Sequence, residues 1–208
     1  AAPGTGKSRT VQEITKVFSA ALDAVGTLST SSSGAVSATS TVAPAVWRPD
    51  LQRWVPQLRQ RLQGRVFQFN ITFENGTAFL PHFDTDPTTA VTRRMLYQLS
   101  TDTSHLSSDV GSWDPLTITR ALAARESVRV GDMTVILSVD GVHQYGDGDL
   151  SHSGSQCYAL VRMLASLSTL WVQEDAPFLI VCAAATVLTP LAALAGSTQR
   201  RRFSSLPR

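Results

Sequence analysis

A glycine-rich segment at the start of the chain has the residue types of a phosphate-binding loop. Glycines let backbone N–H groups turn toward a phosphate, and a helix that begins directly afterwards adds partial positive charge. A Lys-Ser pair after the last glycine would place an ammonium on the β- and γ-phosphates of a nucleotide and a hydroxyl on its Mg²⁺ ion. The segment therefore predicts binding of ATP or GTP with Mg²⁺, by Gly4, Thr5, Gly6, Lys7 and Ser8.

The loop departs from the full pattern at one position. The pattern has glycine five residues before Gly6, and this chain has Ala1 there. The alternative is a glycine-rich start of a helix in which Lys7 and Ser8 are incidental. The periodic apolar residues that follow favour the phosphate loop, because the motif requires a helix at this point.

Asp140 is the second candidate, because it ends a nearly continuous apolar run from Met133 to Val139. Such a run is typical of a strand buried on both faces. A carboxylate at its end would hold Mg²⁺ from the opposite side, through a water. The alternative is an ordinary aspartate in the turn after a strand.

The residue after Asp140 bears on catalysis. Many ATPases have glutamate there to polarise the attacking water, and this chain has Gly141, which cannot accept a proton. His143, Asp147 or Asp149 would substitute only if the following loop folds back. The sequence therefore predicts nucleotide binding with little or no hydrolysis.

Two weaker candidates lie nearer the C-terminus. Thr186 follows the apolar segment Pro177 to Ala183 and is a possible sensor of the γ-phosphate. A threonine that simply leaves a strand is the alternative. Arg200 to Arg202 could include an arginine finger, although basic runs of this kind usually form a solvated face.

The elements that must position these residues alternate between helices and short apolar strands. This order predicts an α/β fold, a mainly parallel sheet with flanking helices, in a single domain over residues 1–208. We expect its first strand to lie upstream of Ala1, next to the strands ending near Phe73 and Asp140 or their neighbours. We expect helices over Gly6–Val25 (ended by Gly26), Leu51–Leu62, Asp86–Leu99, Asp114–Arg125 and Gln156–Trp171, strands over Arg65–Phe73, Met133–Val139 and Pro177–Ala183, and a Ser/Thr/Ala-rich flexible insertion at Thr27–Ala45.

These motifs resemble those of a known class of nucleotide-binding proteins. The segment Pro3–Ser8 and the strand ending at Asp140 resemble the P-loop NTPases of the AAA/STAND group. More narrowly, Phe69–Thr77 followed by Arg94–Tyr97 looks like the crinkler and retrotransposon-hot-spot type, in which a strand ending in an Asn-Gly-Thr turn precedes a helix with Arg-x-Leu-Tyr. The resemblance extends from Gly4 to about Leu206 and implies ATP as ligand. Such families often add a nuclease-like or effector domain, which these residues do not encode.

Composition restricts the remaining possibilities. The 208 residues are 43% hydrophobic and 16% charged, and their net charge of +2 does not indicate nucleic acid. Cys157 and Cys182 have neither zinc-site nor disulfide spacing, which is typical of an intracellular protein, cytoplasmic or nuclear. Two alternatives remain: a degenerate, non-hydrolysing interaction module with protein partners or a homo-oligomer, and a membrane anchor formed by the uncharged run Phe178–Ala195.

Overall fold

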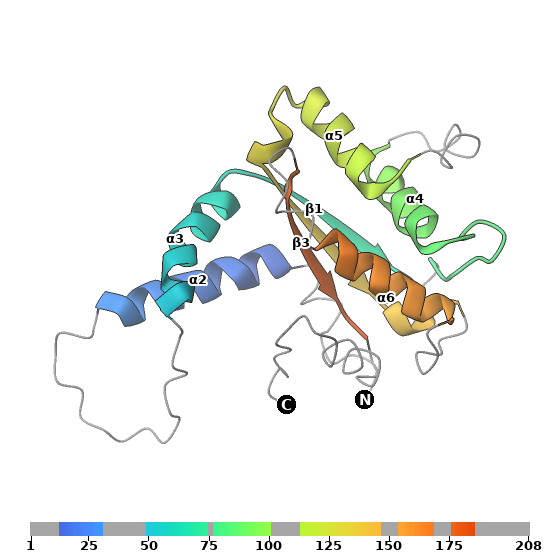
Figure 1. Cartoon of the computed structure of the whole chain (residues 1–208), viewed down its shortest axis with the longest axis horizontal. Helices are drawn as coiled ribbons and strands as arrows, with labels where there is room; N and C mark the ends of the chain where they lie inside the picture. Colours follow the sequence, from blue (N-terminus) through green and yellow to red (C-terminus); the bar gives the residue numbers. More distant parts are fainter. Residues whose placement is uncertain are drawn as a thin grey trace, which may run out of the picture.

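The protein contains a small parallel sheet with helices on both faces (Figure 1). The computed structural model describes residues 13–30, 49–74, 77–100, 113–146, 154–168 and 176–185. Within them the three-stranded sheet has the order β1-β2-β3, and both pairings are parallel. The predicted α/β architecture is therefore confirmed in this part of the chain. The strands are β1 (Arg65–Thr72), β2 (Met133–Asp140) and β3 (Phe178–Ala183).

The register of the sheet brings the ends of two strands together. Thr72 at the end of β1 pairs with Asp140 at the end of β2. Val139 pairs with Ala183 at the end of β3. Because β1 and β2 pair directly along their whole length, no strand lies between them in the described part of the chain, and the strand expected upstream of Ala1 stays a prediction.

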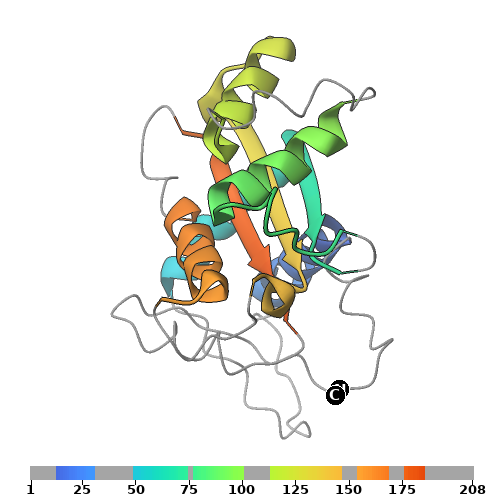
Figure 2. The same ribbon diagram turned by 90° about the vertical axis from the view of Figure 1, so that its right-hand side faces the viewer.

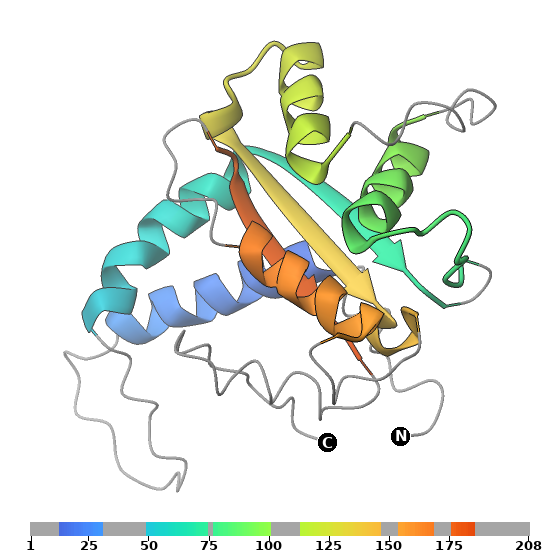
Figure 3. The ribbon, with the colours of Figure 1, turned by 45° about the vertical axis from the view of Figure 1, so that its right-hand side comes forward.

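Helices cover the two faces of the sheet (Figures 2 and 3). One face carries α4 (Pro87–Leu99), α5 (Pro115–Arg125) and α6 (Gln156–Leu167). The other carries α2 (Ile14–Thr30) and α3 (Pro49–Gln63). The main core lies under α4, α5 and α6, where alternate residues of the strands meet apolar side chains of the helices. Its largest buried members include Phe69, Ile71, Met95, Ile118, Val135, Leu137 and Leu160.

Two of the helices begin as their sequences predict. The Asp86 side chain accepts a hydrogen bond from the Thr89 amide at 3.0 Å. The Asp114 side chain accepts one from the Thr117 amide at 2.6 Å. In both helices a proline occupies the first turn, where its missing N–H leaves no hydrogen bond broken.

The structure corrects three expectations about the helices. The helix that we expected over Gly6–Val25 begins as α2 at Ile14, six residues after Ser8, and Gly26 does not end it, because α2 continues to Thr30, four residues into the expected insertion. A single glycine costs only about 1 kcal/mol inside a helix, so it does not end one by itself. Pro56 lies inside α3, which begins earlier than expected. The helix that we expected to reach Trp171 ends at Leu167, where the amide of Ser168 caps it.

The third strand also differs from its prediction. β3 is not buried on both faces: only Leu179 is fully buried, and the remaining side chains are half-buried or exposed. The reason is its position, since β3 pairs with β2 alone among the described strands. The strand accounts for the first part of the uncharged run Phe178–Ala195. In the described residues no helix is both long and apolar enough to span a bilayer.

Candidate functional site

Asp140 lies at the carboxyl edge of the sheet, on its central described strand. Its Oδ1 accepts a hydrogen bond from the Gly141 amide at 2.9 Å, and its backbone oxygen accepts one from the Phe73 amide at 3.1 Å. The residue is half-buried. Local hydrogen bonds thus fix the position of this carboxylate while part of it remains accessible.

The sheet face that carries Asp140 is unusually polar near this edge. Side chains alternate along a strand, so Ser138 and Asp140 point to the same face of β2. Thr72 lies beside Asp140 on that face, because the two residues are partners in the register. Ser138 is 0% exposed, and its hydroxyl, like those of Thr92 and Tyr145, has no hydrogen-bond partner among the described residues. Leaving such a group unpaired costs about 1–3 kcal/mol.

The turn after β2 is held close to the sheet. Gly141 has a φ of 70°, in the left-handed region that favours glycine. The Val142 amide donates to the backbone oxygen of Ala184 at 3.2 Å, and the Ala184 amide donates to that of Val139 at 2.8 Å. The chain therefore turns sharply back at Gly141 and does not extend away from the edge.

Glu74 comes from the neighbouring strand and lies against this turn. A Cβ atom built on Gly141 would be 2.6 Å from the Glu74 Cγ, so the glutamate occupies the space that a side chain at position 141 would take. Its Oε1 lies 3.7 Å from His143 Nε2. An acidic group is therefore present beside the residue that follows Asp140, although the sequence has glycine there.

The sequence predictions did not include Glu74. Its only signal in the sequence is its position directly after the end of a predicted strand. This position does not indicate a site residue until the register of the strands is known to pair Thr72 with Asp140. His143, which we considered only if the loop folded back, does lie close to this edge through its contact with Glu74.

Arg94 fixes the loop that leads away from Glu74. Its guanidinium forms two hydrogen bonds with the Asp84 carboxylate, at 2.8 and 3.0 Å. It also donates to the backbone oxygens of Thr77 at 3.0 Å and Ala78 at 3.2 Å, and it lies 4.3 Å from the ring centroid of Phe73. The Arg-x-Leu-Tyr stretch thus has a structural role on this loop.

Most of the predicted site residues lie outside the described part of the chain. These are Gly4, Thr5, Gly6, Lys7, Ser8, Asp147, Asp149, Thr186 and Arg200 to Arg202. Among the described residues, no group of three or more His, Cys, Asp and Glu side chains could hold a metal ion. Asp140 supplies the hard oxygen atoms that Mg²⁺ prefers, and this ion commonly keeps several waters and needs only one or two protein carboxylates. Asp140 alone does not complete a Mg²⁺ site, so such a site would need further groups from outside the described residues.

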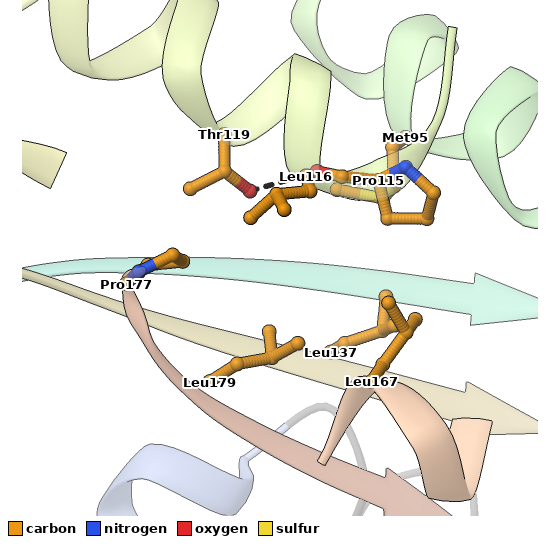
Figure 4. Close-up of a pocket in the computed structure, with 8 residues that line it drawn as sticks. All are labelled: Met95, Pro115, Leu116, Thr119, Leu137, Leu167, Pro177 and Leu179. Carbon is orange, nitrogen blue, oxygen red and sulfur yellow. Dashed lines mark hydrogen bonds between the residues drawn. The ribbon is translucent and has the colours of Figure 1, made fainter. Parts of the chain in front are cut away.

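A small apolar pocket lies elsewhere in the molecule and has no bearing on this chemistry (Figure 4). Leu137 and Leu179 contribute to its floor, and Leu137 belongs to the face of β2 opposite Asp140. Its one hydroxyl, on Thr119, already donates to the backbone oxygen of Pro115 at 2.8 Å. The pocket offers no group for phosphate or for a metal ion.

No known protein family, curated protein or solved structure matches this chain.

Proposed function

We propose that this protein binds a nucleoside triphosphate with Mg²⁺ at the carboxyl edge of its parallel sheet. The phosphates would contact the backbone amides of the Gly4–Ser8 loop and the ammonium of Lys7. The Asp140 carboxylate would help to hold the Mg²⁺ ion from the side of the sheet. The observation that carries the proposal is the position of Asp140 at the end of the central described strand, with the buried and unpaired hydroxyl of Ser138 on the same face.

Sheet topology supports this choice of edge. In parallel α/β sheets, ligands bind outside the carboxyl ends of the strands, where helix N-termini also converge. Thr72 and Asp140 end neighbouring strands at this edge. Their accessible oxygen atoms are suited to a hydrated cation and to the hydroxyls of a ligand.

The position of α2 supports the approach of the phosphate loop to this face. The Thr15 hydroxyl, in the first turn of α2, donates to Gln68 Oε1 at 2.6 Å. Gln68 lies on the same face of the sheet as Asp140, because it pairs with Ile136, four residues before Asp140 on β2. The helix that follows the Gly4–Ser8 segment therefore packs on the face that carries the carboxylate.

The roles of the residues follow from their chemistry. Ser8 and Asp140 would hold Mg²⁺, which supplies positive charge to the phosphate oxygens when it is bound. Lys7 would neutralise the β- and γ-phosphates, and Gly4 and Gly6 would allow the backbone amides to face them. ATP is the nucleotide that the family resemblance implies, and GTP satisfies the same phosphate contacts.

The proposal predicts a Mg²⁺-dependent affinity that requires Asp140. We expect Asp140→Asn to weaken binding of the Mg²⁺ complex of ATP by about 10–100-fold, the usual effect of losing a group that supports a metal site. Isothermal titration calorimetry of ATP and GTP, with Mg²⁺ and with EDTA, measures this. Asp132→Asn is a matched control, because Asp132 lies just before the opposite end of β2 and its side chain is 56% exposed.

Three results distinguish the possibilities. Weakened binding in Asp140→Asn, with unchanged binding in Asp132→Asn, supports the proposal. Equal affinity of Asp140→Asn and the wild-type protein removes Asp140 from the site. No binding of either nucleotide by the wild-type protein contradicts the proposed function and leaves the non-hydrolysing interaction module as the alternative.

A further inference from the structure

We propose that Glu74 is the general base of a nucleotide-hydrolysing reaction at this edge, and that it replaces the acidic residue missing at position 141. This inference rests on the proposed nucleotide site. The sequence alone predicts little or no hydrolysis, because glycine follows Asp140. The geometry places the Glu74 carboxylate beside Gly141, from a residue two positions after the end of β1.

The first argument is the space beside Asp140. A side chain at position 141 would meet Glu74 at 2.6 Å from its Cγ and 3.2 Å from its carboxyl carbon and Oε1. Contacts below 3.0 Å require a shift, so a side chain at 141 would displace the Glu74 side chain from its present position. Gly141 also has a φ of 70°, which a side chain would strain. Gly141 thus has no acidic side chain of its own, and its missing side chain leaves the space that Glu74 occupies.

The second argument is that hydrogen bonds hold the Glu74 backbone in place. The Glu74 amide donates to the Thr72 hydroxyl at 3.0 Å. The Thr77 hydroxyl donates to the backbone oxygens of Glu74 at 2.9 Å and Thr72 at 2.8 Å. Arg94 holds the backbone oxygen of Thr77 at 3.0 Å. The loop that carries the carboxylate is therefore tied both to the end of β1 and to α4.

The third argument is the state of the carboxylate itself. The Glu74 side chain is 28% exposed, so solvent reaches it, and the His143 ring lies 3.7 Å from its Oε1. The imidazole thus lies beside the carboxylate, at a distance longer than a hydrogen bond. A half-buried carboxylate with access to water has the properties that a general base needs.

A separate observation indicates that a ligand belongs at this edge. The Ser138 hydroxyl is completely buried and has no hydrogen-bond partner, and it lies one pleat before Asp140 on the same face. Buried hydroxyl groups are nearly always paired in folded proteins. Together with Asp140, Ser138 marks the surface from which a bound group would be recognised.

The reaction would proceed by attack of one water molecule on the γ-phosphorus. The Glu74 carboxylate accepts a proton from this water as the new oxygen–phosphorus bond forms. The bond between the γ-phosphorus and the oxygen that bridges it to the β-phosphorus breaks, and the nucleoside diphosphate leaves. Inorganic phosphate is the second product, and Glu74 returns its proton to solvent. The charge on the phosphates is balanced by Lys7 and the bound cation.

The test separates catalysis from binding. We expect Glu74→Gln, which keeps the size of the side chain, to lower the rate of phosphate release from ATP by about 10²–10⁴-fold. The nucleotide affinity measured by calorimetry should remain within about threefold of the wild-type value, because the amide removes a proton acceptor and leaves the phosphate contacts intact. Glu74→Asp, which keeps a carboxylate at a shorter reach, should retain part of the rate.

Glu126→Gln is the matched control. The Glu126 side chain is 27% exposed, close to the value for Glu74, and it pairs with Arg65 at the opposite end of β1, at 3.5 Å. We expect its rate and affinity to equal those of the wild-type protein. Melting temperatures of all variants verify that they are folded.

Each outcome has a definite meaning. A lower rate with unchanged affinity in Glu74→Gln supports the inference. An unchanged rate in Glu74→Gln overturns it, and so does a wild-type protein that binds ATP without releasing phosphate; both results leave the proposed nucleotide binding intact. A wild-type protein that binds no nucleotide overturns the proposed function and this inference together.

Discussion

Arg94 is the single residue on which the loop beyond β1 depends most. Its side chain is 12% exposed and that of its partner Asp84 is 2% exposed, so both charges are removed from water. Asp84 also accepts a hydrogen bond from the Leu80 amide at 2.9 Å. The ion pair thus joins the loop at Asp84 to α4, although the Nε atom of Arg94 has no hydrogen-bond partner among the described residues.

Removing one member of this pair should destabilise the protein strongly. We expect Arg94→Leu to lower the free energy of unfolding by about 3–5 kcal/mol, because Asp84 is then left buried without its counter-charge. The double variant Arg94→Leu/Asp84→Leu should lose less than the single variant, since no charge remains unpaired. Urea unfolding of the two variants and the wild-type protein measures the difference. A loss below about 1 kcal/mol in Arg94→Leu would show that the pair is unimportant.

At the residue scale, the sequence predicts part of the candidate site. Asp140 could be found because a long apolar run ends there, and the run is a buried strand as predicted. Glu74 could not be found, because its importance depends on the register between two strands that lie far apart in the chain. The left-handed turn at Gly141 was equally hidden, since glycine there first suggested only the loss of an acidic group.

At the element scale, the sequence predicted helices and strands correctly where N-capping residues or the alternation of apolar and polar residues determined them. The alternating segment from Arg65 gave β1 within one residue, and the two Asp-Pro pairs begin α4 and α5 as expected. The predictions were wrong where the position of an element in the fold determined its burial or its length. β3 is less buried than its apolar sequence predicts because it has one described neighbour, and α2 passes through Gly26.

The N-cap of α4 gives a prediction that depends on pH. Burial raises the pKa of Asp86, but the hydrogen bonds from the side chain and amide of Thr89 and from the Thr88 amide outweigh it, so the pKa is lowered. A carboxyl whose pKa is lower in the folded state stabilises the protein above its unfolded pKa, and this contribution disappears as the pH falls through the folded pKa.

We therefore expect Asp86→Ala to lower the free energy of unfolding by about 1 kcal/mol at pH 7, the usual cost of an N-cap. The difference between wild type and variant should begin to shrink as the pH falls through the unfolded pKa of about 4, and should continue to shrink as the pH falls through the lower folded pKa. Asp86→Asn keeps a capping oxygen without the charge and should show a smaller loss. Chemical unfolding between pH 3 and pH 7 tests this, and a difference that grows toward acid would contradict it.

At the scale of the whole molecule, the described residues form a layered α/β structure (Figure 3). Its main core lies on one face of the sheet, and Thr72, Ser138 and Asp140 lie toward the carboxyl end of the other face. Helices at five positions could be predicted from local sequence patterns. Of these, α4, α5 and α6 each bury several side chains, whereas Leu22 is the one fully buried side chain among those described on α2 and α3. The order of the strands could not be predicted, because it depends on contacts between distant segments.

The most direct measurement of the central claim is the affinity for the Mg²⁺ complex of ATP in the wild-type protein and in Lys7→Ala, by isothermal titration calorimetry. In the proposed site, Lys7 would supply the full positive charge of the glycine-rich loop to the phosphates. Lys16→Ala is the control, because the Lys16 side chain is 80% exposed and its contact with Glu13 is a surface pair at 3.8 Å. We predict that the wild-type protein and Lys16→Ala bind with equal affinity and that Lys7→Ala shows no detectable binding. Unchanged affinity in Lys7→Ala would contradict the phosphate loop and the nucleotide site built on it.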